Sequence, residues 1–226
     1  MSKVSNYRGG NYTEEQYVET IGLIEELSSP VGTAAIAESM GLSMPSVSEM
    51  LHRLSDKGLV DYARYSGAAL SESGRDLYSS VIRRHRLWEV FLTRHLGISW
   101  HEVYDHACEL EHATTELVTR QLATYLGDPE SCPHGSPIPR ADGTWPPARG
   151  IPLLDREVGS NYVVERILQE NDVDCLEFLY GRGIVPGAVI RLVDIASYDG
   201  TVTLEVEGRM GAVGHGVASR LRVSNR

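Results

Sequence analysis

The spacing of apolar residues changes partway along the chain, and this change limits the folds that the chain can adopt. Apolar residues recur at helical spacing over most of residues 12–126, whereas strand-like runs follow near 162–164, 188–193 and 201–206. Residues 128–156 lie between these regions and are rich in proline and glycine, which is typical of a loop and linker. The pattern therefore predicts a helical N-terminal part and a separate, small C-terminal module that is mostly β and forms a partly open barrel.

A helix-turn-helix pattern followed by a hairpin lies near the N-terminus. Residues 33–40 read as a short helix that ends at Gly41, and Pro45 suits the first turn of a helix that Gly58 closes. Residues 59–70 then read as a β-hairpin that turns at Ser66 and Gly67. Two short helices with a tight turn and a following hairpin predict a winged helix-turn-helix.

A winged helix places the N-terminal residues of its third helix at base edges in the DNA major groove. Basic residues later on that helix and in the wing are expected to hold phosphates, which position the protein without specifying a sequence. A winged helix that binds a protein partner is the alternative. The candidate DNA-binding residues are Ser43, Pro45, Ser46, Ser48, Glu49, Arg53, Lys57 and Arg64.

The net charge of −10 counts against a nucleic-acid binder, because non-specific DNA affinity depends on positive charge. A local patch of Arg53, Lys57 and Arg64 reduces this objection, and cations bound by carboxylates would reduce it further. The three cysteines are too few and too scattered for a disulfide framework, which favours a reduced compartment. The sequence has no apolar run of membrane-spanning length and no apolar signal core, so we expect a cytoplasmic protein with no membrane partner.

Five metal-ligating residues occupy two consecutive predicted helices. Cys108, Glu111 and His112 share one face of a helix predicted over 99–126, and His85 and Glu89 share a face of the helix predicted over 72–96. If these helices pack antiparallel, the five side chains converge on a site suited to Fe(II), Mn(II), Co(II), Ni(II) or Zn(II). Any one of the five has an ordinary structural interpretation, but their joint occurrence favours a metal site. The Cys132-Pro133-His134 segment is interpreted as loop structure.

The order of these parts resembles the family of diphtheria-toxin repressors and manganese-transport regulators. The resemblance covers nearly the whole chain and is most specific between residues 12 and 140. The final module resembles the SH3-like module of the longer members. The motifs that carry the resemblance are LSMPSVS (42–48), LSESGR (70–75), RRHRLWE (83–89), ACELEHA (107–113) and PHGSPIP (133–139).

The resemblance implies a homodimer that binds near-palindromic double-stranded DNA at genes of metal uptake or storage. Its residue matches imply a primary metal site and an ancillary one, so that each subunit binds two ions of Mn(II) or Fe(II). In the first helix, iron-type members carry Met and manganese-type members carry Asp where this chain has Gln16, and Glu19 matches a second carboxylate of manganese-type members. The implied ligands are Cys108, Glu111 and His112 in the primary site, His85 and Glu89 in the ancillary site, Gln16 or Glu19 from the first helix, and Asp172 from the SH3-like module.

We therefore predict a mainly α protein with a β module, and a function as a metal-dependent transcriptional repressor rather than an enzyme. No small-molecule substrate is expected. A metalloenzyme with a helical metal site, such as a hydrolase or an oxygenase, is the main alternative, and a metal-independent winged-helix adaptor is a second one. The predicted units are a winged helix-turn-helix domain over 1–74, a helical metal-binding and dimerisation domain over 75–145, a linker over 146–156 and an SH3-like domain over 157–226.

Overall fold

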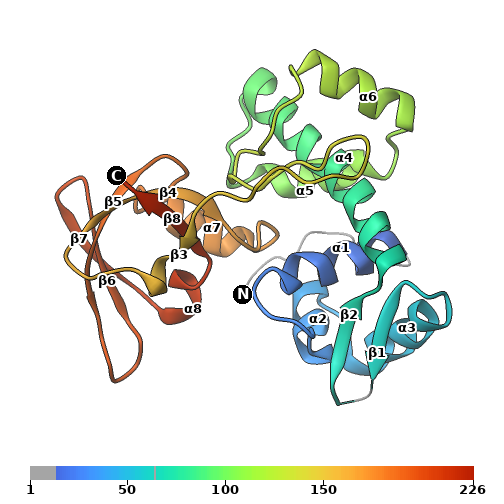
Figure 1. Ribbon diagram of the computed structural model, residues 1–226, viewed down its shortest axis with the longest axis horizontal. Coiled ribbons are helices and arrows are strands. Elements are labelled where there is room, and N and C mark those ends of the chain that lie inside the picture. Colours follow the sequence, from blue (N-terminus) through green and yellow to red (C-terminus); the bar gives the residue numbers. More distant parts are fainter. Residues whose placement is uncertain (1–13, 64) are drawn as a thin grey trace.

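Three structural units follow one another along the chain in the computed structural model, which describes residues 14–63 and 65–226 (Figure 1). A winged-helix head comes first, a helical unit built around one long helix comes second, and a β-rich module comes last. This arrangement confirms the predicted fold class. No helix within the described ranges is long and apolar enough to cross a membrane.

The head consists of three helices and a two-stranded hairpin. Its elements are α1 (Glu14–Glu25), α2 (Thr33–Met40), α3 (Met44–Asp56), β1 (Val60–Ala63) and β2 (Gly67–Leu70). Gly41 ends α2 in the left-handed region with φ of 64°, and the Ser43 side chain caps α3 by accepting a hydrogen bond from the Ser46 amide. Fully buried Val47 and Leu51 pack α3 onto the head's core, so the helix-turn-helix and its wing form as predicted.

The helical unit differs from the prediction in one respect. Its elements are α4 (Glu72–Leu96), α5 (Val103–Glu111) and α6 (Glu116–Tyr125). We predicted one helix over 99–126, but the chain bends after His112. Thr114 donates a hydrogen bond to the Leu110 carbonyl and accepts one from Trp88, and the Thr115 side chain caps α6. Threonine side chains compete with helical hydrogen bonds in this way, and the helix is divided where they do so.

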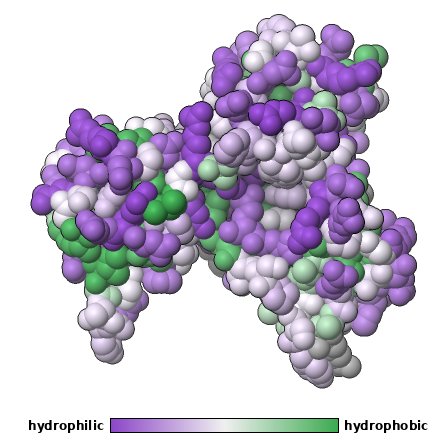
Figure 2. All heavy atoms as spheres, in the orientation of Figure 1, coloured by the Kyte–Doolittle hydropathy of each residue, from purple (hydrophilic) through white to green (hydrophobic). Residues whose placement is uncertain are grey.

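The C-terminal module is a six-stranded antiparallel sheet in the order β3-β8-β4-β5-β6-β7. Apolar residues alternate with polar ones on its strands, and the inward-facing ones form a core that α7 helps to close. Figure 2 shows that hydrophilic residues cover much of the face in view, while hydrophobic residues gather in places on this module. Its elements are β3 (Ile151–Pro152), the 3-10 helix η1 (Leu153–Asp155), β4 (Asn161–Ile167), α7 (Val173–Tyr180), β5 (Val189–Ile195), β6 (Val202–Val206), β7 (Arg209–Val213), α8 (His215–Ala218) and β8 (Leu221–Asn225).

Candidate metal centre

Polar ligand atoms gather in the interior at the junction of the three units. Within the described residues, three groups each bring their ligand atoms within 4.8 Å of one another. One residue, Glu111, belongs to two of the groups. The groups are Cys108, Glu111 and His112; Glu19, His85 and Glu111; and Glu89, Cys132, His134 and Glu170.

The first group lies at the end of α5, where one helical turn brings its three side chains to the same side. Nε2 of His112 lies 3.2 Å from Oε1 of Glu111. Gln16, on α1 of the head, hydrogen-bonds the half-buried Cys108 from the other side. The predicted trio therefore does converge, and a first-helix residue reaches it.

The second group joins α1 to α4 and α5. His85, which is fully buried on α4, directs Nδ1 toward Oε2 of Glu111 at 2.7 Å and toward Oε1 of Glu19 at 3.6 Å. Tyr104 donates a hydrogen bond to the same Glu19 oxygen at 3.3 Å. Glu19 is 2% exposed and comes from an otherwise largely apolar face of α1, so its burial is explained by these partners.

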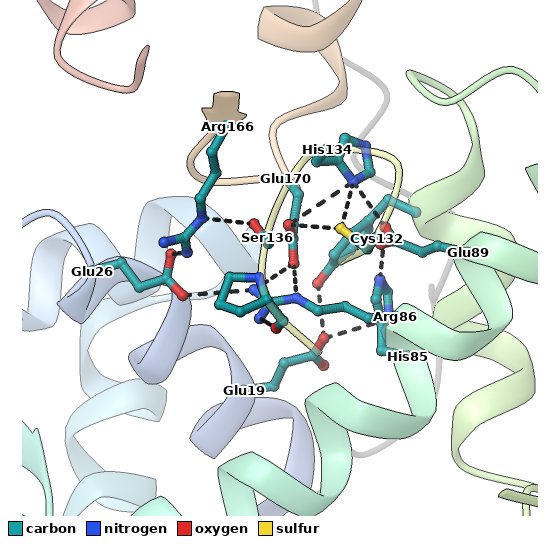
Figure 3. A network of polar contacts seen from close by, with 12 residues as sticks. Glu19, Glu26, His85, Arg86, Glu89, Cys132, His134, Ser136, Arg166 and Glu170 are labelled. Atoms are coloured by element: carbon teal, nitrogen blue, oxygen red, sulfur yellow. Dashed lines mark hydrogen bonds and ion pairs between the residues drawn. The ribbon is translucent and has the colours of Figure 1, made fainter. Parts of the chain in front are cut away.

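The third group contains residues that our sequence analysis missed (Figure 3). Nδ1 of His134 lies 3.2 Å from Oε1 of Glu89, and Oε2 of Glu170 lies 3.9 Å from the same nitrogen. We interpreted Cys132-Pro133-His134 as loop structure, but both side chains point into this group, where Sγ of Cys132 lies 3.8 Å from Glu170. The Cys-x-His spacing, next to proline and glycine, was the sequence pattern that could have indicated a pair of ligands here.

The orientation of His134 is fixed by a hydrogen bond outside the group. Its Nε2 donates to the main-chain carbonyl of Trp100 at 2.7 Å. Since a carbonyl only accepts hydrogen bonds, Nε2 carries a proton and Nδ1 is the atom presented to the group. Metal-ligating histidines are commonly oriented by such a bond from the other ring nitrogen.

Gly135 allows the loop that carries His134 to lie against the C-terminal module. Its φ is 84°, and a Cβ atom added there would lie 2.0 Å from the Glu165 carbonyl on β4. We expect Gly135→Ala to separate the loop from β4 and to destabilise the protein by about 2 kcal/mol. Thermal unfolding would measure the loss, with Gly143→Ala as the control. Gly143 also has a positive φ, of 80°, but a Cβ there meets nothing. Equal losses in both variants would contradict the close-approach argument.

The pKa values of the side chains in these groups are strongly shifted by burial and by neighbouring charges. Burial, with the nearby Glu111 carboxylate, raises the pKa of Glu19 well above its usual value. Burial opposes the charge of Glu89 as well, but the imidazoles of His134 and His85 together hold its pKa well below the usual range. Burial and the carboxylates of Glu19 and Glu111 raise the pKa of the Cys108 thiol. Such an accumulation of carboxylates and thiols in the interior requires a positive partner.

Some buried ligand atoms make no hydrogen bond among the described residues. Oε2 of Glu89, Oε1 of Glu111 and Nε2 of His112 are buried and make no hydrogen bond there. Buried polar atoms are nearly always paired, so these atoms indicate a missing ligand. Carboxylate, imidazole and thiolate donors are the set that divalent first-row transition metals prefer. The residues present therefore fit a metal ion.

Asp172 does not lie in these groups. It caps α7 by accepting a hydrogen bond from the Cys175 amide and pairs with Arg220 at 2.6 Å. Glu170, two residues earlier, is the acidic residue of the C-terminal module that reaches the third group. The resemblance implied Asp172, but the turn before α7 uses that side chain as a helix cap and directs the Glu170 carboxylate toward the third group instead.

Five of the eight residues predicted to bind DNA are exposed on α3 or at its N-cap, and the other three differ. Ser43, Pro45, Ser46, Glu49 and Arg53 are exposed. Ser48 is instead half-buried and hydrogen-bonds Tyr62 of the wing at 3.1 Å. Lys57 is exposed but pairs with Glu14 at 2.5 Å, and Arg64 lies outside the described residues.

The fold and the site together define a winged-helix DNA-binding protein with a buried cluster of metal-ligating side chains between its reading head and its helical unit. Comparison with known proteins supports this class. Residues 12–68 match the iron-dependent repressor N-terminal DNA-binding domain, residues 71–140 match the iron-dependent repressor metal-binding and dimerisation domain, and residues 151–225 match the FeoA domain. The chain belongs to the family of iron-dependent and diphtheria-toxin repressors.

Several relatives match over most of their length. The iron-dependent repressor IdeR of Mycobacterium tuberculosis is 35% identical, over 87% of this chain and 89% of the relative. The diphtheria toxin repressor of Corynebacterium efficiens is 34% identical, over 93% of this chain and 94% of the relative. The solved structure of the manganese regulator SloR superimposes with a TM-score of 0.85 at 30% identity, over 96% of this chain and all of that one.

Proposed function

We propose that this protein is a metal-dependent transcriptional repressor, which binds a near-palindromic DNA duplex as a homodimer when Mn(II) or Fe(II) occupies its sites. The observation that carries the proposal is the bridging of α1, in the reading head, to α4 and α5 through Glu19, His85 and Glu111. The relatives are named as iron-dependent and manganese-dependent repressors, not as enzymes, which favours this role over the metalloenzyme alternative. A cytoplasmic location would follow from the role.

The site residues that we propose divide into two centres. Cys108, Glu111 and His112, with Gln16 or Glu19 from α1, would hold one ion, and the group of Glu89, Cys132, His134 and Glu170 would hold the other. His85 lies between the centres, since its Nδ1 faces Glu111 and its Nε2 faces Glu89 at 3.2 Å. Two ions per subunit would thus share one ordered array of side chains. The functional units would be the DNA-binding domain over 1–74, the metal-binding and dimerisation domain over 75–145, and the SH3-like domain over 157–226.

The buried carboxylates explain how metal would control the reading head. Glu19 and Glu111 repel each other when both are ionised, and a bound divalent cation would offset this repulsion with more positive charge than the His85 imidazole between them can supply. With that repulsion removed, Glu19 can hold α1 against α4 and α5, and the third helix of each subunit keeps a fixed position. A dimer reads successive major grooves only if its two recognition helices lie about 34 Å apart. DNA must in turn tighten metal binding, because coupling between two ligands is reciprocal.

Selection of DNA from a random-sequence library tests the proposal. The purified protein would be incubated with the library in Mn(II), and the retained duplexes would be sequenced over several rounds. We expect enrichment of one near-palindromic sequence with half-sites about one helical turn apart, protected as a unit in footprinting. Retention of random sequence, with no enriched half-sites, would overturn the assignment as a specific repressor.

We expect Arg53→Ala to weaken binding to every DNA sequence by a similar factor. Arg53 is exposed on α3 beyond the predicted base-reading residues, so it is placed to contact phosphate. Loss of one phosphate contact should reduce the slope of log K against log salt by about one. Titrations at several salt concentrations measure this slope, with Arg182→Ala, an exposed position in the C-terminal module, as the control. An unchanged slope for the Arg53 variant would remove this residue from the phosphate contacts.

A further inference from the structure

Direct polar contacts join the C-terminal module to the described part of the reading head. Arg166 of β4, which is 7% exposed, forms an ion pair with Glu26, the residue that follows α1. Nδ2 of Asn171, in the turn before α7, donates a hydrogen bond to the Ser39 hydroxyl on α2 at 3.0 Å. The module therefore touches both helices of the head that precede the recognition helix.

Glu26 is also connected to the third ligand group (Figure 3). Its Oε2 faces Arg166, and its Oε1 lies 3.6 Å from a guanidinium nitrogen of the fully buried Arg86. Arg86 pairs in turn with Oε1 of Glu170 at 2.8 Å. The other oxygen of Glu170 faces Cys132 and His134. Glu170 thus has two roles. One of its oxygens faces the other members of the third ligand group, and the second oxygen is connected through Arg86 to Glu26 at the end of α1.

An aromatic stack contacts the same end of α1. Trp145, in the segment between α6 and β3, stacks on Tyr78 of α4 with ring centroids 5.8 Å apart and an interplanar angle of 23°. A Cβ atom added at Gly22 of α1 would lie 2.5 Å from the Tyr78 ring. Trp145 and the C-terminal module therefore both lie against the C-terminal end of α1, one through Tyr78 and the other through Glu26.

We propose that Glu26 and Arg166 are positioning residues that fasten the reading head to the C-terminal module, so that the order of the Glu170 group is transmitted to α1 and α2. This inference rests on the proposed function and deepens it, because it assigns the module a role in regulation. The charges involved are largely buried, and salt screens such pairs much less than exposed ones. Removal of one charge of a buried ion pair leaves the other charge unpaired, which is destabilising. Each substitution should therefore loosen the packing of the head.

Hydrogen-deuterium exchange and DNA binding would test the proposal together. Arg166→Gln would be compared with Arg191→Gln, which removes a charge from an exposed ion pair with Glu205 in the same module, a pair that makes none of the described contacts with the head. We expect faster exchange in the peptides that cover 14–40 for Arg166→Gln only, measured in Mn(II) without DNA. Its affinity for the duplex selected by the wild-type protein should fall about fivefold, within the usual range of coupling between sites.

Further variants separate positioning from general destabilisation. Arg166→Lys should retain most of the protection from exchange. Glu26→Gln should have the same effect as Arg166→Gln, and the double variant should show no larger effect than either single one. Metal stoichiometry should stay at the wild-type value in each. Exchange over 14–40 that matches the Arg191→Gln control, or additive effects of the two substitutions, would overturn the inference. Because the exchange comparison uses no DNA, it stands even if the wild-type protein fails to respond to Mn(II) in DNA binding.

Discussion

Replacing Glu111 with glutamine will abolish metal-activated DNA binding and leave a folded protein. Glu111 is fully buried, and its two oxygens face different imidazoles, with Oε2 at 2.7 Å from His85 and Oε1 at 3.2 Å from His112. It is the one residue shared by the first two ligand groups among the described residues. Glutamine keeps the size and can still hydrogen-bond His85, but it removes the charge that attracts a cation. We expect metal affinity at this centre to fall by at least about 100-fold.

Isothermal titration with Mn(II), followed by titration of the selected DNA duplex, would measure both losses. Glu109→Gln is the matched control, since Glu109 lies on the same helix, is exposed and belongs to none of the groups. Circular dichroism would establish that the Glu111 variant is folded. DNA binding that still responds to Mn(II) as in the wild-type protein would show that Glu111 is not a ligand.

Replacing His134 with alanine will reduce the number of metal ions bound per subunit from two to one. His134 Nδ1 and His85 Nε2 each lie 3.2 Å from the same Glu89 oxygen, and His134 is held in place by Trp100. Without this imidazole, Glu89 loses the first of the two positive groups that lower its pKa, and the third group loses its only nitrogen donor among the described residues. The first centre keeps all its ligands, so the loss should be confined to one ion.

Metal content after dialysis against a limiting Mn(II) buffer, measured by mass spectrometry, tests this expectation. His101→Ala serves as the control, because His101 lies in the same junction, stacked on Tyr180 at 4.2 Å between ring centroids, but belongs to no ligand group. Two ions retained by the His134 variant would refute the third group as a metal centre. Loss of an ion from the His101 variant as well would point to general damage at the junction.

The features set by local sequence were predicted well. Ser71 and Gly97 cap the two ends of α4, so the bounds 72–96 could be predicted from capping residues and spacing alone. Cys108, Glu111 and His112 lie within one turn of one helix, and their convergence follows from helical geometry. The predicted contribution of the first helix required the resemblance, because no local pattern on α1 distinguishes Glu19 from an ordinary surface carboxylate.

The features set by tertiary contacts were not predictable in this way. Cys132, His134 and Glu170 come from two loops far apart in the sequence and meet Glu89 only because Gly135 lets one loop lie against β4. Likewise, the choice between Glu170 and Asp172 depends on the turn before α7, where the Asp172 side chain is used as a helix cap. The bend after His112 depends on Trp88, whose hydrogen bond to Thr114 joins α4 to the segment between α5 and α6.

The affinity of the protein for its selected DNA duplex, with and without metal, tests the central claim most directly. The protein would be stripped with a chelator, dialysed and titrated by fluorescence anisotropy in the absence of metal and at saturating Mn(II) and, under anaerobic conditions, Fe(II). Metal that holds α1 in place should tighten binding by between about 10-fold and 100-fold. Equal affinity of the stripped and the loaded protein for the duplex would contradict the account.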